Sequence, residues 1–310
     1  SPEQFNVTAY GATSVAVITF EAFAGMWINA FMVSVICMAW VKKKTLNSNE
    51  KILLVLGCSR FWHLCFSCVY SFLSVIYPNY FYVAPTYTLI VSLQSFFECS
   101  NLWVSACLCV FYCIKIANFR NSFFIYLKVK VDRMVPWLLL GSVLLSLAIS
   151  ILILDITGKA HCKNSTSQGN SSEVSIRMEE RFFSFFLIYG FEFATSFTAV
   201  IFSALLLLFS LWRHKHNMQT NSMKDLSMDA HIKAMKSILS FLVMYSINFA
   251  CLILNMVYAT KTISPAIFLI YVFLYTFTVV HSLILIFGNP KLEKTLLRIL
   301  PYVKFKVCMR

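Results

Sequence analysis

Charged residues are scarce in this chain. Asp, Glu, Lys and Arg make up 13% of its 310 residues, about half the share found in ordinary soluble domains. Glycine is scarce too: eight glycines leave no Gly-rich loop that could cradle phosphates and give little sign of the broken helices of transporter sites. The metalloprotease pattern H-E-x-x-H and the hydrolase pattern G-x-S-x-G are both absent. We therefore expect no enzyme, and neither a metal nor a cofactor.

Paired extracellular cysteines are also lacking. The chain has 11 cysteines, but most lie inside apolar runs, and only Cys162 lies clearly in a connection that we place outside the cell. A framework of extracellular disulfides is therefore not expected, and the cysteines are interpreted as free thiols. The first apolar run is too long for the core of a cleavable signal peptide and lacks a small-residue cleavage site, so no such peptide is expected.

Apolar residues are abundant instead. They make up 59% of the chain, with 30 phenylalanines and a mean hydropathy of +0.74. Seven apolar runs are each long enough to cross a bilayer core of about 30 Å. This pattern predicts an all-α membrane protein with seven transmembrane helices in a single domain over residues 1–310. The predicted spans are 13–41, 52–76, 86–116, 135–156, 182–212, 232–259 and 264–287.

The basic residues indicate how the chain is oriented. The formal net charge is +13, but the lysines and arginines gather in alternate connections and in the tail, so nucleic acid is not expected as a partner. By the positive-inside rule, the basic connections and the C-terminus are cytoplasmic and the N-terminus is outside. Three N-glycosylation sequons lie on the side that the basic residues avoid, which agrees with this orientation. They begin at Asn6, Asn164 and Asn170.

The tail contains a further amphipathic segment. Gly288, Asn289 and Pro290 end the last span, and the sequence LEKTLLRIL that follows has amphipathic helical spacing. We predict a short helix at residues 290–304 that lies on the inner membrane surface in contact with lipid. An ordinary solvated tail is the alternative.

Residues 94–119 are the most informative stretch. Gln94, Glu98, Asn101 and Ser105 follow one another at steps of four, three and four, so their side chains share one face of an otherwise apolar helix. A carboxyl and an amide at membrane depth are costly unless they face a bundle interior or a watery cavity. We therefore expect this helix to be a central member of the bundle, with its polar face turned inward.

Other spans carry similar polar stripes, and depth separates them into two sets. An outer set of acids, amides and tyrosines suits a small-molecule pocket, whereas an inner set around Arg60 suits a structural switch, because a guanidinium keeps its charge and needs acceptors. For each residue a satisfied contact between helices is an equally good interpretation. For Glu98 and Glu192 we favour a ligand or cavity water, since no basic residue lies at their depth. The outer set is Gln94, Glu98, Tyr189, Glu192, Tyr245, Asn248, Tyr271 and Tyr275; the inner set is Asn29, Arg60, Ser105, His281 and Ser282.

Several motifs resemble those of one receptor family, the bitter taste receptors (taste receptor type 2). They are LGCSR at residues 56–60, LW at 102–103 with FYCIKIANF at 111–119, LLLLFSLWRHKHNM from residue 205, and HSLILIFGNPK at 281–291. The resemblance covers nearly the whole chain. It implies a G-protein-coupled receptor of the plasma membrane that binds small-molecule bitter agonists and activates a gustducin-like or Gi-type heterotrimeric G protein.

The resemblance also implies roles for individual residues. The family's pocket positions fall at Gln94, Glu98, Tyr245 and Tyr271. With neighbours at similar depth, the candidate ligand-binding residues are Gln94, Ser95, Glu98, Tyr189, Glu192, Tyr245, Asn248, Tyr271 and Tyr275. The family's switch positions fall at Arg60, Tyr112, Lys115, His281 and Ser282, to which we add Asn29 from the inner set.

The chain departs from the family pattern at the pocket. Many members have tryptophan where Gln94 stands, so an amide replaces an aromatic platform. Two cavity acids, Glu98 and Glu192, suggest a bias toward basic or hydroxylated agonists. Two other interpretations are a vomeronasal type 1 pheromone receptor, which belongs to a related family of similar architecture, and a small-solute membrane transporter. The odd number of spans and the lack of an internal repeat do not favour the transporter.

Overall fold

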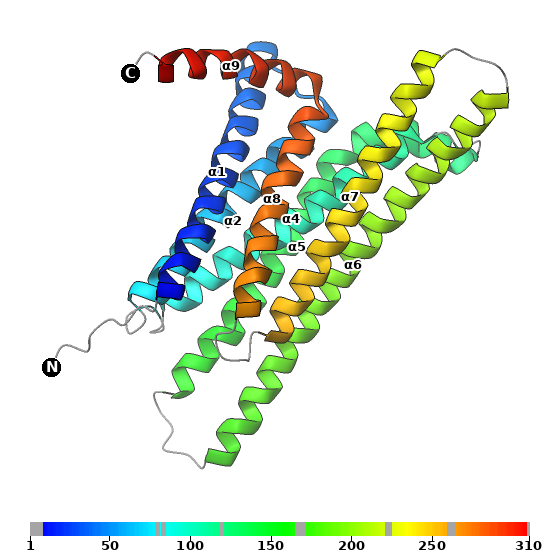
Figure 1. The fold of residues 1–310 in the computed structure, drawn as a ribbon. Helices are drawn as coiled ribbons and strands as arrows, with labels where there is room; N and C mark the ends of the chain where they lie inside the picture. Colours follow the sequence, from blue (N-terminus) through cyan, green and yellow to red (C-terminus); the bar gives the residue numbers. More distant parts are fainter. Residues whose placement is uncertain are drawn as a thin grey trace.

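The computed structural model describes residues 9–77, 81, 85–117, 119, 121–164, 171–220, 225–258 and 265–308. All regular structure in these residues is helical (Figure 1). Seven of the helices are long and apolar enough to cross a membrane, which confirms the predicted all-α, seven-span fold class. The helices are α1 (Ala9–Lys43), α2 (Ser48–Ile76), α4 (Thr86–Ile116), α5 (Ser122–Asn164), α6 (Ser171–Thr220), α7 (Asp225–Tyr258), α8 (Pro265–Phe287) and α9 (Pro290–Cys308).

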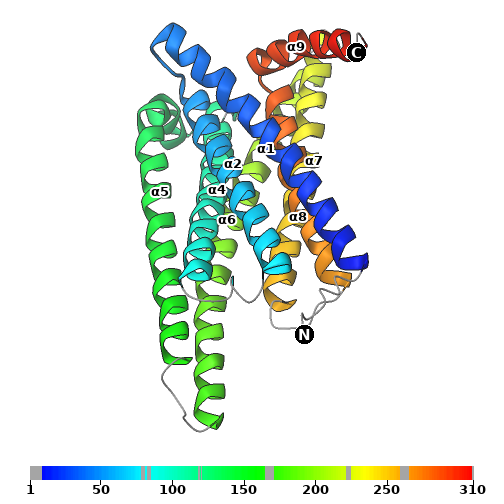
Figure 2. The same cartoon turned by 90° about the vertical axis from the view of Figure 1, so that its left-hand side faces the viewer.

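Helices α5 and α6 are both longer than their predicted spans. α6 spans Ser171–Thr220, whereas its apolar stretch is Phe186–Arg213. α5 exceeds its predicted span of 135–156, because its apolar stretch itself extends over Ser122–Gly158. The flanks of α6 are rich in Glu, Arg and Met, which are good helix formers in water as well as in lipid. As a result, α5 and α6 project past the other helices at the end of the bundle away from α9 (Figure 2).

The centre of the bundle is occupied by α4. This helix packs against α2, α5 and α6, and its buried residues include both apolar side chains and serines. Asn289 begins α9 by accepting hydrogen bonds from the backbone N–H groups of Lys291 (3.1 Å) and Leu292 (3.4 Å), and Pro290 occupies the first helical position, where proline fits well. α9 then crosses the end of the bundle at a steep angle to α1 and α8 (Figure 1).

Two glycines bring α1 and α2 close together. A Cβ atom added at Gly57 would lie 2.8 Å from Val33 Cγ2 and 2.9 Å from Met32 Cε, and one added at Gly25 would lie 2.7 Å from Leu64 Cδ1. Small residues at such contacts let membrane helices approach through van der Waals packing. Glycine at both positions therefore sets the close spacing of α1 and α2, the helices that carry Asn29 and Arg60.

The main apolar core lies near the end covered by α9. Its largest cluster joins residues of α1, α2, α4, α5, α8 and α9, including Met32, Leu53, Leu108, Val135 and Leu292, all of them 2% exposed or less. We call this end, which α9 crosses and where α1 and α4 end in lysines, the basic end. The opposite end, which α5 and α6 overshoot, is called the far end. Apolar clusters toward the far end are smaller.

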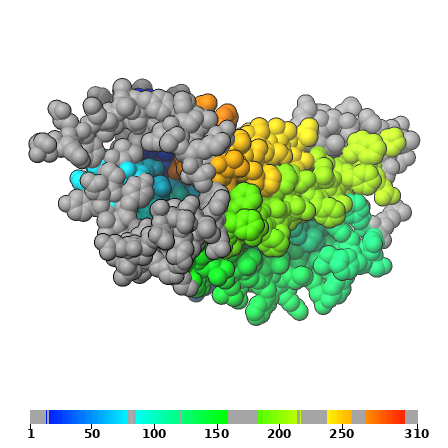
Figure 3. Space-filling view, turned by 90° about the horizontal axis from the view of Figure 1, so that it is seen from below, coloured from blue at the N-terminus to red at the C-terminus, as the bar shows by residue number. Residues whose placement is uncertain are grey.

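The outward faces of the helices are apolar and exposed. Phe20, Trp27, Trp137 and Phe191 are each between 72% and 75% exposed, which is expected where lipid chains replace water. Seen from the far end, α5, α6 and α7 lie side by side in the part of the surface coloured green to orange (Figure 3). The polar side chains of the interior therefore lie within a bundle whose exterior suits a bilayer.

Candidate functional site

A buried arginine connects three of the helices. Arg60 of α2 is 1% exposed, and its guanidinium contacts α4 and α8. Nε donates to Asn101 Oδ1 at 2.9 Å, and Nη1 donates to Ser282 Oγ at 3.0 Å. Nη2 lies 2.7 Å from His281 Nδ1 and 3.5 Å from Ser105 Oγ. Within the described residues, no carboxylate forms an ion pair with Arg60, so neutral groups hold its charge.

This arrangement fixes the neighbouring polar groups as well. Since a guanidinium can only donate, His281 Nδ1 must accept, and the proton of the imidazole is placed on Nε2. Ser282 Oγ accepts from Arg60 and donates to Asn29 Oδ1 at 3.1 Å, while Asn29 Nδ2 donates to the backbone carbonyl of Gly25 at 2.8 Å. α1, α2, α4 and α8 are thus joined through one set of hydrogen bonds, which we call the Arg60 network.

The network brings together four of the six predicted switch residues: Asn29, Arg60, His281 and Ser282. Asn101 was not among the predicted site residues, although it is the best-placed acceptor for Arg60 Nε. Its position in the polar stripe of residues 94–105 is the sequence feature that could have identified it as a site residue. A buried charge that depends on neutral acceptors is costly to disturb, because removal of one acceptor leaves a charged donor unsatisfied.

The other two predicted switch residues lie at the basic end. The Tyr112 hydroxyl donates to Asn49 Oδ1 at 3.0 Å, and Lys115 Nζ donates to Asp132 Oδ2 at 2.5 Å. Lys115 and Asp132 are 36% and 51% exposed, so solvent screens this ion pair. Tyr112 and Lys115 therefore connect α4 to α2 and α5 at the basic end, apart from the Arg60 network.

A second polar cluster joins α4 and α6 in the far half. Cys99 Sγ donates to Glu192 Oε2 at 2.9 Å, and Glu192 is 1% exposed. Ser95 Oγ donates to the carbonyl of Val91 at 2.8 Å, so in its 2.5 Å contact with the Tyr189 hydroxyl it acts as the acceptor. Ser95, Tyr189 and Glu192, all predicted ligand residues, are brought together here; we call them, with Glu98 and Cys99, the α4–α6 cluster.

The acids in this cluster are not fully satisfied. Glu192 Oε1 is buried without a hydrogen bond of good geometry, and the Trp103 indole N–H lies near it without completing one. Glu98 is partly buried and makes no hydrogen bond to the described residues. Its carboxylate is close enough to that of Glu192 for the two to repel each other when both are ionised. The cluster therefore favours a donor or a positive charge between α4 and α6.

The remaining predicted ligand residues occupy different surroundings. Tyr275 packs with Ala22 and Leu64, with Tyr271 at the edge of this group. The ring of Tyr245 lies deeper than the sequence suggested, stacked parallel to Phe197 at 6.1 Å and edge-on to Phe277 at 5.9 Å. Asn248 is buried on α7, one turn nearer the far end, and Gln94 is partly buried on α4.

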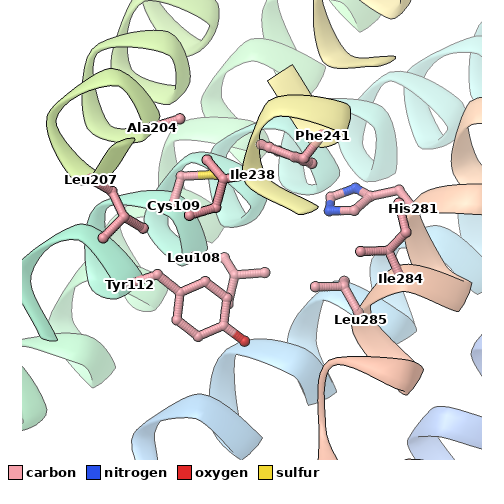
Figure 4. Close-up of a pocket in the computed structure, with 10 residues that line it drawn as sticks. All are labelled: Leu108, Cys109, Tyr112, Ala204, Leu207, Ile238, Phe241, His281, Ile284 and Leu285. Carbon is pink, nitrogen blue, oxygen red and sulfur yellow. The ribbon is translucent and has the colours of Figure 1, made fainter. Parts of the chain in front are cut away.

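A cavity of about 130 Å³ lies between the Arg60 network and the basic end (Figure 4). Four helices line it: α4, α6, α7 and α8. The lining is apolar except at its rim, where the His281 imidazole and the Tyr112 hydroxyl are found (Figure 4). Its lining residues are Leu108, Cys109, Tyr112, Ala204, Leu207, Ile238, Phe241, His281, Ile284 and Leu285. Sequence reasoning did not anticipate this cavity, because its residues form no polar stripe.

Some predictions fall where the structure gives no test. Asn6 and Asn170 lie outside the described residues, and Asn164 is described only as the last residue of α5. Within the described part of the chain, no group of three or more His, Cys, Asp or Glu side chains is placed to hold a metal ion.

Seven apolar helices around a buried polar interior, with an amphipathic helix after the last span, define a seven-helix membrane receptor of the G-protein-coupled class. Residues 7–304 match the family described as "Taste receptor protein (TAS2R)", and the chain belongs to that family. It is a bitter taste receptor, a multi-pass protein of the plasma membrane rather than an enzyme. In general, such receptors respond to small-molecule agonists and couple to G proteins.

Individual relatives cover more than nine-tenths of the chain. Human taste receptor type 2 member 2 is 30% identical over 294 residues, which are 92% of this chain and 95% of the relative. Taste receptor type 2 member 40 of Gallus gallus is 30% identical over 300 residues, covering 95% and 96%. Member 9 of Papio hamadryas is 30% identical over 303 residues, covering 94% of each. These matches favour the taste receptor over the pheromone receptor and transporter alternatives.

Proposed function

We propose that this receptor binds its bitter agonist in the far half of the bundle, at the α4–α6 cluster, and activates a gustducin-like or Gi-type G protein at the basic end. The observation that carries the proposal is Glu192, which is 1% exposed and has one oxygen held by Cys99 and the other unsatisfied. An unsatisfied buried carboxylate is costly, and an agonist that supplies a hydrogen-bond donor removes this cost. Ser95, Tyr189 and Glu98 surround the same point.

The path from this cluster to the basic end runs along α4 and α8. One turn beyond Glu98, Asn101 accepts from Arg60, and Ser105 follows one turn later. On α8, Ser282 and His281 hold Arg60. An agonist that shifts α4 against α6 therefore changes the contacts available to Arg60, which supports a role for the Arg60 network in choosing between two packings of the bundle.

The basic end suits a G protein in charge and in shape. If the N-terminus lies outside, as the basic connections predict, the lysines of this end face the cytoplasm. The apolar cavity between α4, α6, α7 and α8 has Tyr112 in its lining (Figure 4) and offers a starting point for insertion of an apolar helix end.

Agonist-dependent calcium release tests the proposal directly. Cells that express the receptor are exposed to a panel of bitter amines and neutral bitter compounds, with and without a matched Gα subunit. We expect at least one response that requires both the receptor and the Gα subunit. A response that is independent of Gα, or accumulation of the compound inside receptor-expressing cells, would point to a transporter instead.

A further inference from the structure

The first turn of α2 contacts three other helices through three consecutive residues. Ser48 Oγ donates to the backbone carbonyl of Asp132 on α5 at 3.4 Å. Asn49 Oδ1 accepts from the Tyr112 hydroxyl on α4 at 3.0 Å. Glu50 Oε1 accepts from Lys291 Nζ on α9 at 2.6 Å. We call residues 47–50 the α2 lock, because they hold α4, α5 and α9 at a single point of the basic end.

The α2 lock is held rigidly by its own helix. Glu50 Oε2 accepts from the backbone N–H of Asn47 at 3.1 Å, so one carboxylate both closes the start of α2 and binds α9. Ser48 and Glu50 are 9% and 8% exposed. Beside them Leu292 of α9 is fully buried in the main apolar core. The side chain of Asn49 is therefore presented to Tyr112 from a fixed backbone.

The basic end is closed in this structure. The cavity beside Tyr112 has a volume of about 130 Å³ and an apolar lining. At this end α2 is hydrogen-bonded to α4, α5 and α9. Tyr112 is one of the residues that line the cavity. Contacts that fix Tyr112 in place thus belong to the closed form of the basic end.

We propose that Asn49 and Glu50 are positioning residues for G protein coupling, which hold Tyr112 and α9 in the closed form and release them when the basic end opens. The proposal rests on the proposed function, since it assumes that the G protein docks at this end. Loss of either contact favours the open form, because it removes a stabilising interaction from the closed form alone. Basal signalling without agonist should rise as a result.

The test compares basal nucleotide exchange on a matched Gα subunit in membranes that carry equal amounts of surface receptor. Asn49→Ala and Tyr112→Phe each remove one partner of the same hydrogen bond. Each is expected to raise basal exchange about fivefold, the change in an equilibrium expected from one neutral hydrogen bond. The double variant is expected to match either single variant, because the second substitution has no contact left to remove.

Conservative variants separate positioning from general destabilisation. Asn49→Asp keeps an acceptor for the Tyr112 hydroxyl and is expected to restore low basal exchange. Lys291→Gln removes the ion pair with Glu50 and is expected to raise basal exchange about twofold, a smaller effect because Lys291 is 34% exposed. Lys294→Gln is the matched control: it makes the same change on the exposed surface of α9 and should leave basal exchange at the wild-type level.

Several results would overturn the proposal. They are unchanged or lowered basal exchange in Tyr112→Phe at normal surface level, additive effects in the double variant, or equal effects of Lys291→Gln and Lys294→Gln. Should Asn49→Ala fail to reach the surface, Tyr112→Phe still decides, since it removes only a hydroxyl. A wild-type receptor that activates no Gα with any agonist would instead refute the proposed function.

Discussion

The two acids of the α4–α6 cluster give the sharpest test of the agonist site. Glu98→Gln and Glu192→Gln keep the size and shape of each side chain but remove its charge. Both acids lie in the far half, and only one of their four carboxylate oxygens, Glu192 Oε2, accepts a hydrogen bond of good geometry from the described residues. A protonated amine placed between α4 and α6 would therefore meet two carboxylates with capacity to accept its protons.

The expected magnitude follows from the loss of one charged partner. A hydrogen bond to a charged group contributes about 1.5–3 kcal/mol, which corresponds to a loss in amine potency of about 10-fold to 150-fold. Glu98→Gln should show the larger effect, because one oxygen of Glu192 already accepts a hydrogen bond from Cys99. Neutral agonists should keep their potency within a few fold, since a glutamine amide still offers a hydrogen-bond acceptor.

The assay is a concentration–response curve for calcium release, measured with amines and their neutral isosteres. Glu21→Gln provides the control, because Glu21 is also a partly buried membrane acid but contacts Thr276 of α8 at 3.1 Å, between α1 and α8. This variant should leave amine potency unchanged. Unchanged potency of every amine agonist in both Glu98→Gln and Glu192→Gln would refute the reasoning.

Three further predictions follow from the structure and the sequence. Arg60→Lys keeps the charge, but a compact ammonium with three donors cannot reproduce the four contacts that the guanidinium makes through three nitrogens. The maximal agonist response should therefore fall more than tenfold at equal surface expression; a full response would show that the Arg60 network is dispensable. Gly57→Val forces side-chain atoms against Val33 and Met32 and should destabilise the receptor by about 1–3 kcal/mol, seen as a lower melting temperature in detergent; an unchanged melting temperature would contradict the close packing of α1 and α2. If Asn164 and Asn170 carry glycans, glycosidase treatment changes the electrophoretic mobility of the wild-type receptor, and replacement of both residues by Gln should remove that change. If the wild type carries no glycan, only the distribution of basic residues supports the predicted orientation.

Much of the fold followed from composition and helical spacing. The seven apolar runs predicted seven helices, and the polar stripe of α4 predicted a helix with many neighbours. The ends of α5 and α6 were underestimated for different reasons. The apolar stretch of α5 itself extends over Ser122–Gly158, beyond the predicted span, whereas α6 continues past its apolar stretch, where hydropathy gives no signal. Good helix formers in the flanks of α6 favour this continuation.

The partners of individual side chains were harder to infer. Arg60 was expected to need acceptors, but spacing on one helix cannot say which neighbouring helix supplies them, and Asn101 is identified only by packing. Tyr112 donates to Asn49, and Lys115 donates to Asp132, each on a different helix. Helical periodicity shows which residues share a face of one helix, but not which residue of another helix that face contacts. The pairing of Asn47 with Glu50 was detectable, since an Asn followed three residues later by Glu before an apolar run marks a helix start.

The uneven distribution of the apolar core has a consequence for how such receptors diversify. The largest cluster joins six helices near α9, while smaller clusters support the far half. Substitutions in the far half consequently cost less folding energy, since fewer packed groups depend on them. If the agonist binds in the far half, as we propose, a lineage can change its ligand there while the packing near α9 stays constant.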